Sequence, residues 1–233
     1  PAPTPYTFVW LADTQALAST YPEIYECVIQ HVADQREAKN IVCLLHTGDL
    51  INNAYTDHDG LNAQKAFALL PDDLQVFTAM GNHDQVTVYE QFTGKPSQSY
   101  APYLNIRFDN NILPEAEFMD GISHYALFSA GGTDYLLLSI GYGVHRESVP
   151  FAQAAIEAYP DRTVILVTHH YMKLNGTRPR TGTEIFDSLV KPYPNVKIVL
   201  CGHLRGAARN AVSLDDDGDG QPDRTVHELM YNY

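Results

Sequence analysis

Five short apolar segments of this chain each end at a side chain that can bind a metal ion or transfer a proton. Their lengths and their aliphatic, often β-branched composition are typical of strands that are buried on both faces of a sheet. The carboxyl ends of strands line the ligand crevice of an open α/β sheet. We therefore expect the polar residues that follow these segments to lie close together. The segments are residues 7–12, 41–45, 74–80, 164–167 and 196–200.

The residues that follow the five segments are acids, an amide and imidazoles. Taken singly, an Asp has an ordinary role as a helix cap and an Asn as a turn residue. Packing explains one such ending more easily than it explains five. The residues are Asp13, Asp49, the run Gly81-Asn82-His83-Asp84, His169 and His203.

Helical spacing of apolar residues separates the predicted strands. After Pro22, which suits the first turn of a helix, apolar residues recur every three or four positions. Strands that alternate with helices in this way indicate βαβ units and parallel pairing. The expected helices cover residues 21–39, 61–70, 149–158 and 184–190.

The second half of the chain adds further strands. Two strand-like runs, 125–128 and 135–138, flank a Gly-Gly pair, which indicates a hairpin. Residues 207–214 and 225–231 are expected to form two more strands around an acidic turn. Together the elements predict two sheets packed face to face with helices outside.

Length and composition fit one large domain. At 233 residues and 45% hydrophobic content, the chain is able to bury a full core. We expect a linker remnant at 1–5, a single domain over 6–233, and a longer multidomain chain around them. Residues 92–120, with Gly, Pro and Asn, predict a long functional loop or an insertion at the rim of the site. No run reaches the roughly 18 apolar residues of a membrane span, so we expect no membrane insertion.

The charge balance bears on the partners of the protein. The chain has 28 acidic and 15 basic residues, which gives a formal net charge of -13. Such a field repels nucleic acid at long range, so we expect no nucleic-acid partner. An anionic substrate has to be captured by local cations, either metal ions or arginines.

The residues at the strand ends are those that a hydrolytic metal site requires. Two neighbouring metal ions need a bridging carboxylate, for which Asp49 is suited, and Asp13 offers a second carboxylate. Neutral oxygen and nitrogen donors favour Zn, Fe or Mn over Ca. His83 is able to protonate a departing oxygen, with the neighbouring Asp84 orienting its imidazole. The neutral donors are Asn82, His169 and His203.

In this order the motifs resemble those of the calcineurin-like metallophosphoesterases. The resemblance covers residues 6–205, and its most specific part is the Gly-Asn-His-Asp run that begins at Gly81. It implies a four-layer α/β/β/α sandwich of two mixed sheets flanked by helices. It also implies a dinuclear centre that hydrolyses small phosphate mono- or diesters by attack of a metal-bound hydroxide.

By motif position, the resemblance also implies roles for individual residues. Asp49 would bridge the metals, Asp13 would bind the first, and Asn82, His169 and His203 would complete the second. His83 would be the general acid, paired with Asp84. Of the other histidines, we expect His170 to line the pocket and His46 at most to support a ligand.

Two positions depart from the family pattern. Gln15 and Arg205 stand where the family has histidines that serve the first metal. Gln offers an amide oxygen, but a guanidinium cannot bind a cation. We therefore expect one firmly held transition-metal ion, a second that is weak or absent, and Arg205 placed to hold phosphate. The alternative function is a one-metal, catalytically weak or inactive binding module for an anionic ligand.

An acidic turn near the end of the chain resembles a calcium loop. Its acids match positions 1, 3, 5 and 9 of an EF-hand loop, but Val226 stands at position 12, where the bidentate Glu is missing. A structural calcium ion and a merely solvated turn are the two alternatives. Calcium would favour an extracellular or cell-surface setting in a bacterium, and a structural cell-surface module is the third class of function. The acids are Asp215, Asp217, Asp219 and Asp223.

Overall fold

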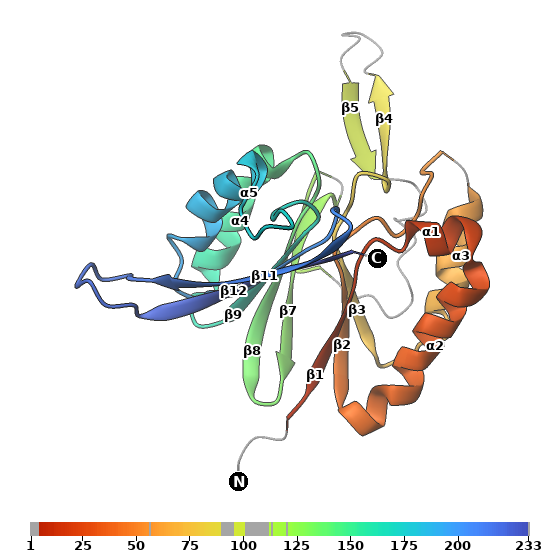
Figure 1. The fold of residues 1–233 in the computed structure, drawn as a ribbon, viewed down its shortest axis with the longest axis horizontal. Coiled ribbons are helices and arrows are strands. Elements are labelled where there is room, and N and C mark those ends of the chain that lie inside the picture. Colours follow the sequence, from red (N-terminus) through yellow and green to blue (C-terminus); the bar gives the residue numbers. More distant parts are fainter. Residues whose placement is uncertain are drawn as a thin grey trace.

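Two sheets stacked face to face lie between two layers of helices (Figure 1). The computed structural model describes residues 5–55, 57–89, 96–100, 112, 114–119 and 121–232. The predicted four-layer α/β/β/α sandwich is confirmed.

The smaller sheet carries the first three strands, all parallel, in the order β1-β2-β3. Its outer face is covered by the helices α1 to α3. The strands are β1 (Thr7–Leu11), β2 (Ile41–His46) and β3 (Gln75–Thr78). The helices are α1 (Gln15–Thr20), α2 (Pro22–Lys39) and α3 (Asp57–Phe67).

The larger sheet has the order β11-β12-β10-β9-β8-β7-β6 and mixes parallel with antiparallel pairs. Its strands are β6 (Ala116–Phe118), β7 (Ser123–Ala130), β8 (Thr133–Ile140), β9 (Thr163–Thr168), β10 (Val196–Cys201), β11 (Gly206–Leu214) and β12 (Arg224–Asn232). Its outer face packs on α4 (His145–Ala158), α5 (Arg180–Ile185) and the π-helical turn η1 (Phe186–Val190). Two mixed sheets were predicted. Among the described strands, the larger sheet is mixed, whereas the smaller sheet is entirely parallel.

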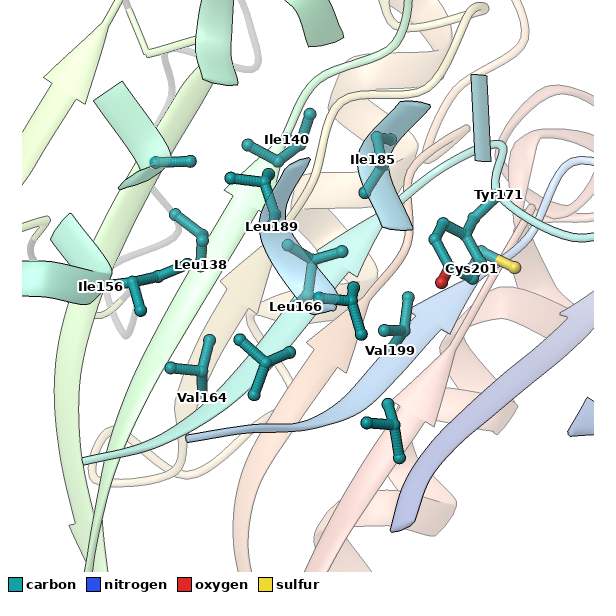
Figure 2. Packing of buried hydrophobic residues seen from close by; sticks show 14 of the residues in the cluster. Leu138, Ile140, Ile156, Val164, Leu166, Tyr171, Ile185, Leu189, Val199 and Cys201 are labelled. Atoms are coloured by element: carbon teal, nitrogen blue, oxygen red, sulfur yellow. The ribbon is translucent and has the colours of Figure 1, made fainter. Parts of the chain in front are cut away.

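Alternation of side chains along the strands builds three separate apolar layers. In β2, Leu44 packs on the helices, whereas Cys43 and Leu45 pack between the two sheets. In β9, Val164 and Leu166 face α4 and η1, as Figure 2 shows. Because successive side chains of a strand point to opposite faces, a strand covered on both sides has to be apolar throughout.

Most predicted elements are confirmed, with shifted ends. α2 begins at Pro22 and ends at Lys39, and the left-handed backbone of the next residue, Asn40 (φ 47°), caps the helix. α3 starts four residues earlier than predicted, at two acids that favour a helix N-terminus. α4 also starts early, and Pro150 lies inside it rather than at its start. The Gly-Gly hairpin is confirmed, with positive φ at both glycines, as a two-residue turn requires.

Of the two alternatives predicted for residues 92–120, a long loop or a rim insertion, the long loop is partly wrong. Two short strands lie in it: β5 (Pro96–Tyr100), which pairs with β4 (Gln85–Tyr89) in a two-stranded ribbon, and β6 at the edge of the larger sheet. The rest of the segment, at 92–95, 101–111, 113 and 120, lies outside the described residues. Among the described helices, none is long and apolar enough to cross a membrane.

Candidate metal centre

Parallel pairing brings the five predicted strand ends to one edge of the sandwich. β1, β2 and β3 run parallel, and so do β9 and β10. The two groups are joined at this edge, because His203 donates its backbone N–H to both carboxylate oxygens of Asp13 at 3.0 Å. His169 also donates from Nδ1 to the carbonyl oxygen of Thr47 at 2.9 Å. Residues far apart in the sequence thus share one site.

The loops at this edge hold a strained backbone. Asp13, Asp49 and His203 have φ of 55°, 56° and 72°, in the left-handed region that non-glycine residues avoid. Such a conformation costs on the order of 1–3 kcal/mol per residue and persists only where the surrounding structure enforces it. Of the five non-glycine residues with positive φ in the described chain, three therefore lie at the candidate site.

Two glycines are required here by close approach. A Cβ atom on Gly81 would collide with the side chain of Asp49, and one on Gly202 would collide with the carboxylate of Asp13. Any larger residue would push these carboxylates away from the site.

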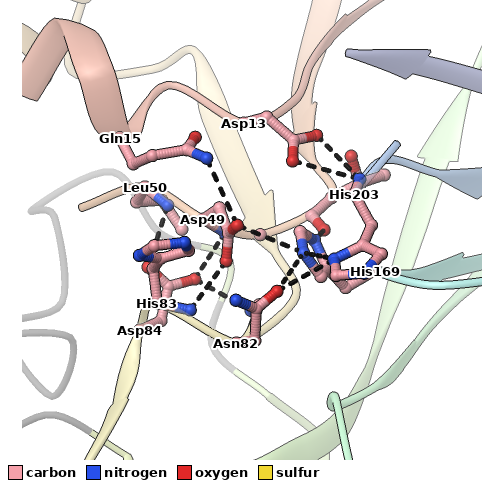
Figure 3. Close-up of polar contacts among 12 residues, drawn as sticks. Asp13, Gln15, Asp49, Leu50, Asn82, His83, Asp84, His169 and His203 are labelled. Carbon is pink, nitrogen blue, oxygen red and sulfur yellow. Dashed lines mark hydrogen bonds and ion pairs between the residues drawn. The ribbon is translucent and has the colours of Figure 1, made fainter. Parts of the chain in front are cut away.

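Three donor atoms converge at the centre of the site, and a carboxylate oxygen lies beside one of them (Figure 3). Asn82 Oδ1 lies 3.0 Å from His169 Nε2 and 2.9 Å from His203 Nδ1, and these two nitrogens are 3.1 Å apart. Asp49 Oδ2 lies 3.3 Å from His169 Nε2. The ligand atoms of a tetrahedral ion bound at about 2.0–2.2 Å are roughly 3.3–3.6 Å apart. The cluster therefore has nearly the spacing of a single bound ion.

The chemistry of these donors fits a divalent cation. Since His169 donates its Nδ1 proton to Thr47, its neutral tautomer directs the lone pair of Nε2 at the cluster. That lone pair faces the carboxylate of Asp49 and the amide oxygen of Asn82, which are also electron-rich. Three acceptors that face one another in a buried space call for a positive charge between them. Imidazole, amide and carboxylate donors together suit Mn, Fe or Zn.

The pKa shifts reflect the same arrangement. Burial lowers the pKa of His169, but the hydrogen bond and charge of Asp49 outweigh it and raise the pKa. Burial conversely raises the pKa of Asp49, and His169 brings it below its usual range. Burial is also the main cause that raises the pKa of Asp13 to about 6. The site thus favours a positive group beside Asp49.

The predicted first-metal site, at Asp13 and Gln15, differs from the donor cluster in its hydrogen bonds. Asp13, Asp49 and His169 have ligand atoms within 4.8 Å of one another, so they also form a group able to hold an ion. Gln15, however, directs its amide Nε2 at Asp49 Oδ2, at 3.4 Å. Its Oε1 is buried with no hydrogen-bond partner among the described residues. As placed, Gln15 offers the shared carboxylate a hydrogen-bond donor.

Asp84 is not the partner of His83, and this prediction is wrong. The buried carboxylate of Asp84 accepts backbone N–H bonds from Asp49 and Gly81 on one oxygen, at 2.7 and 2.8 Å. On the other oxygen it accepts those of Leu50 and Ile51, at 2.8 and 3.2 Å. Burial, and then the charge of Asp49, raises the pKa of Asp84 to about 7, while the amide donors lower it. Its role is to hold the loop after β2 against the loop after β3.

The imidazole of His83 is held by the main chain instead. Its Nδ1 donates to the carbonyl oxygen of Asn52 at 2.9 Å, and its backbone N–H donates to Asp49 Oδ1 at 2.9 Å. Among the described residues, no hydrogen bond occupies Nε2 of His83, so this atom is available to act on a ligand. The role of Asn52 could not be predicted from its residue type, because the contact uses its backbone carbonyl oxygen.

Arg205 is not brought into the donor cluster. Its side chain is exposed, and no hydrogen bond or ion pair joins it to another described residue. It follows His203 by two positions, at the rim of the site. Its predicted contact with phosphate therefore stays a prediction.

His46 contacts residues next to the candidate metal ligands, as expected for a supporting residue. Its Nδ1 accepts the N–H of Gly48 at 3.1 Å, and its Nε2 contacts Thr14 Oγ1 at 3.0 Å. Burial lowers the pKa of His46 to about 3, so this imidazole stays neutral. A neutral, fully buried ring thus fixes the residues next to Asp13 and Asp49.

Tyr142 was missed by the sequence reasoning. Its ring centroid lies 5.8 Å from that of His169, 5.6 Å from that of His203 and 6.4 Å from that of His170. Tyr142 follows β8 by two residues, so the rule applied to the other strand ends would have found it. His170 lines a pocket, as expected.

The acidic turn forms a second, exposed group of carboxylates. Asp215, Asp217 and Asp223 have ligand atoms within 4.8 Å of one another, whereas Asp219 is not part of this group. The loop is also ordered by its own hydrogen bonds, such as those from Gly218 and Gly220 to Asp215 at 2.7 and 2.8 Å. Calcium binding here stays a prediction.

Added calcium tests that prediction. A ligand that binds only the folded chain stabilises it, so 10 mM calcium is expected to raise Tm by roughly 3–8 °C. Asp215→Asn should abolish the increase, because the loop then loses a charged ligand. Differential scanning calorimetry measures both proteins, and an equal Tm with calcium and with chelator in the unchanged protein would show a solvated turn.

A cluster of Asp, Asn and His side chains thus lies at the strand ends of a four-layer sandwich. The chain belongs to the calcineurin-like phosphoesterase family, whose model matches residues 6–204. The family implies divalent metal ions, in agreement with the buried donors described above.

The chain is also similar to individual proteins. The uncharacterized protein YvnB of Bacillus subtilis is 34% identical over 238 residues, and the chain spans 18% of its length. Among solved structures, a purple acid phosphatase from yellow lupin matches 99% of this chain and 45% of its own, with a TM-score of 0.63 and 13% identity. A dimetal phosphatase from Danio rerio matches 97% and 86%, with a TM-score of 0.58 and 14% identity. These structures share the fold.

Proposed function

We propose that this domain is a metal-dependent hydrolase of small phosphate mono- or diesters. The observation that carries the proposal is the mutual contact of Asn82, His169 and His203 at one point, with the carboxylate of Asp49 beside His169. The family assignment supports the same class of reaction.

These four residues would hold one divalent transition-metal ion firmly. When bound there, the ion would supply an acidified water molecule and a positive charge for the phosphoryl oxygens. Asp13 and Gln15 would form a weaker first site, because Gln15 turns an amide donor toward Asp49. Arg205, at the rim, would add a fixed positive charge toward the phosphate.

His83 would act as the general acid. Its contact with Asn52 fixes the ring through Nδ1, so that a proton on Nε2 faces the departing oxygen. Its backbone N–H holds Asp49, which couples the position of the acid to that of the metal ligands. Asp84 would act only as a positioning residue, through the loops that it joins.

Two substrates with different leaving groups test this role of His83. A poor alkoxide leaving group needs a proton, whereas p-nitrophenolate leaves readily without one. In His83→Ala protein, turnover of an alkyl phosphate is expected to fall by about 10²–10⁴-fold. Turnover of p-nitrophenyl phosphate should fall much less. Steady-state kinetics with added Mn²⁺ or Zn²⁺ measures both.

His31→Ala, a change of an exposed histidine on α2, is the matched control. An equal loss on both substrates would contradict the general-acid role. If the unchanged protein hydrolyses no phosphoester faster than His83→Ala protein does, whichever metal is added, that result would favour the alternative of an anion-binding module.

The wider setting of the domain is also a proposal. We propose a longer, extracellular or cell-surface bacterial protein as its parent. This chain spans 18% of the length of the Bacillus relative, which supports a longer parent protein. A calcium-binding turn would support an extracellular or cell-surface location.

A further inference from the structure

Two buried carboxylates hold the loop that follows β2. Asp84 accepts the backbone N–H groups of residues 49–51, as described above. The next two N–H groups, those of Asn52 and Asn53, donate to one oxygen of Asp59, Oδ2, at 3.1 and 3.0 Å. Asp59 lies in the first turn of α3, and its side chain is only 6% exposed. The backbone of the whole loop from 49 to 53 is thus fixed by two carboxylates.

One peptide group of this loop connects Asp59 to His83. The carbonyl group of Asn52 and the N–H group of Asn53 belong to the same peptide unit. Its N–H donates to Asp59 Oδ2 at 3.0 Å, and its carbonyl oxygen accepts from His83 Nδ1 at 2.9 Å. Because a carbonyl oxygen only accepts, Nδ1 of His83 carries a proton. A continuous chain of hydrogen bonds therefore runs from the carboxylate through the peptide to the imidazole.

The two hydrogen bonds of this peptide strengthen each other. A peptide group that donates to a carboxylate is polarised, which makes its carbonyl oxygen a better acceptor. The side chains of Asn52 and Asn53 are exposed, so the packing of these side chains does not fix the peptide. Asp59, by contrast, is buried on a helix that packs against α1 and α2. Asp59 is therefore placed to set the orientation of the peptide and, through it, of the ring.

We propose that Asp59 is a positioning residue for His83 and acts through the peptide between Asn52 and Asn53. The inference rests on the proposed phosphoesterase function, in which His83 protonates the departing oxygen. The imidazolium gives its Nε2 proton to that oxygen, which keeps the electron pair of the broken P–O bond. The ring is left as the neutral form with its proton on Nδ1, the form that the carbonyl oxygen of Asn52 accepts. Asp59 thus takes, through one peptide, the role that the sequence suggested for Asp84.

The dependence on the leaving group tests this role of Asp59. In Asp59→Ala protein, turnover of an alkyl phosphate is expected to fall by about tenfold or more, a part of the about 10²–10⁴-fold that a general acid contributes. Turnover of p-nitrophenyl phosphate, which needs no proton, should fall by less than about threefold. Asp59→Asn keeps an acceptor oxygen but loses the charge, so only about a threefold loss on the alkyl phosphate is expected. Asp57→Ala, at an exposed acid in the same turn of α3, is the matched control and should change neither rate.

A double variant separates positioning of His83 from a general loss of structure. Once His83 is absent, Asp59 has no acid to position. Protein with both Asp59→Ala and His83→Ala is therefore expected to match His83→Ala protein on the alkyl phosphate, whereas two independent effects would multiply. Steady-state kinetics measures all variants, and the loss is expected in kcat, with KM changed by less than about twofold.

The tautomer of His83 tests the contact without requiring turnover. In Zn²⁺-loaded protein with isotope-labelled histidine, long-range proton–nitrogen NMR spectra distinguish a proton on Nδ1 from one on Nε2. The signals of His83 are those that disappear in His83→Ala protein. For the neutral ring, the form with the proton on Nδ1 is expected in the unchanged protein and in Asp59→Asn protein. A mixture of both forms is expected in Asp59→Ala protein.

An equal loss on both substrates in Asp59→Ala protein would overturn the inference, and so would a further loss in the double variant or an unchanged tautomer of His83. If Asp59→Ala protein does not fold, an equal loss on both substrates in Asp59→Asn protein overturns it in the same way. Failure of the proposed function has a different outcome. In that case no phosphoester is hydrolysed, although Asp59→Ala still changes the tautomer of His83, and Asp59 remains the residue that positions this ring.

Discussion

The turnover of phosphoesters by Asn82→Ala protein is expected to fall by at least about 100-fold. Residues that only hydrogen-bond to a metal ligand already contribute up to that much. Asn82 Oδ1 is the atom closest to both His169 Nε2 and His203 Nδ1, and its loss leaves two imidazoles and a carboxylate for the ion. Divalent metal should bind far more weakly. Kinetics over a range of metal concentration, together with a metal Kd, separates loss of binding from loss of rate.

Asn82→Asp is the matched variant, because it keeps an oxygen donor at the same place and adds a charge. It is expected to retain the metal, whereas Asn82→Ala does not. If Asn82→Ala held metal as tightly as the unchanged chain, Asn82 would not be a ligand.

Asp84→Ala should have the largest effect on stability. One buried carboxylate accepts four backbone N–H groups of two loops, and its removal leaves those donors without partners. Each unpaired buried donor costs about 1–3 kcal/mol, so with partial relaxation the free energy of unfolding is expected to fall by about 3–5 kcal/mol. Urea unfolding followed by circular dichroism measures this change.

Asp72→Asn, at an exposed carboxyl just before β3, is the control and should change stability by less than about 0.5 kcal/mol. A loss below 1 kcal/mol in Asp84→Ala would show that the loops are held by other contacts. Metal binding by the surviving folded protein should also weaken, because Asp49 and Asn82 belong to the loops that Asp84 joins.

The fold and the donor cluster were predictable because their signals are local. Strands buried on both faces are apolar throughout, and parallel strands end at one edge, so Asp13, Asp49, Asn82, His169 and His203 had to meet. The start of α4 was predicted four residues too late, at 149 instead of His145, because the apolar spacing does not mark the first turn of this helix.

Contacts that depend on three-dimensional orientation were not predictable. Asp84 follows His83 directly, which suggested a pair, yet the backbone turns the carboxylate toward four amide groups and away from the imidazole. His145 and Glu184 are 39 residues apart, and nothing in either local sequence indicates their contact. Backbone partners such as the carbonyl oxygen of Thr47 carry no sequence signal at all.

The position of a bound metal, located by anomalous scattering in crystals grown with Mn²⁺ or Zn²⁺, tests the central claim most directly. The account predicts a strong peak enclosed by Asp49, Asn82, His169 and His203, with a weaker peak or none beside Asp13 and Gln15. A folded chain with no peak among those four donors, or with its strongest peak elsewhere, would contradict it.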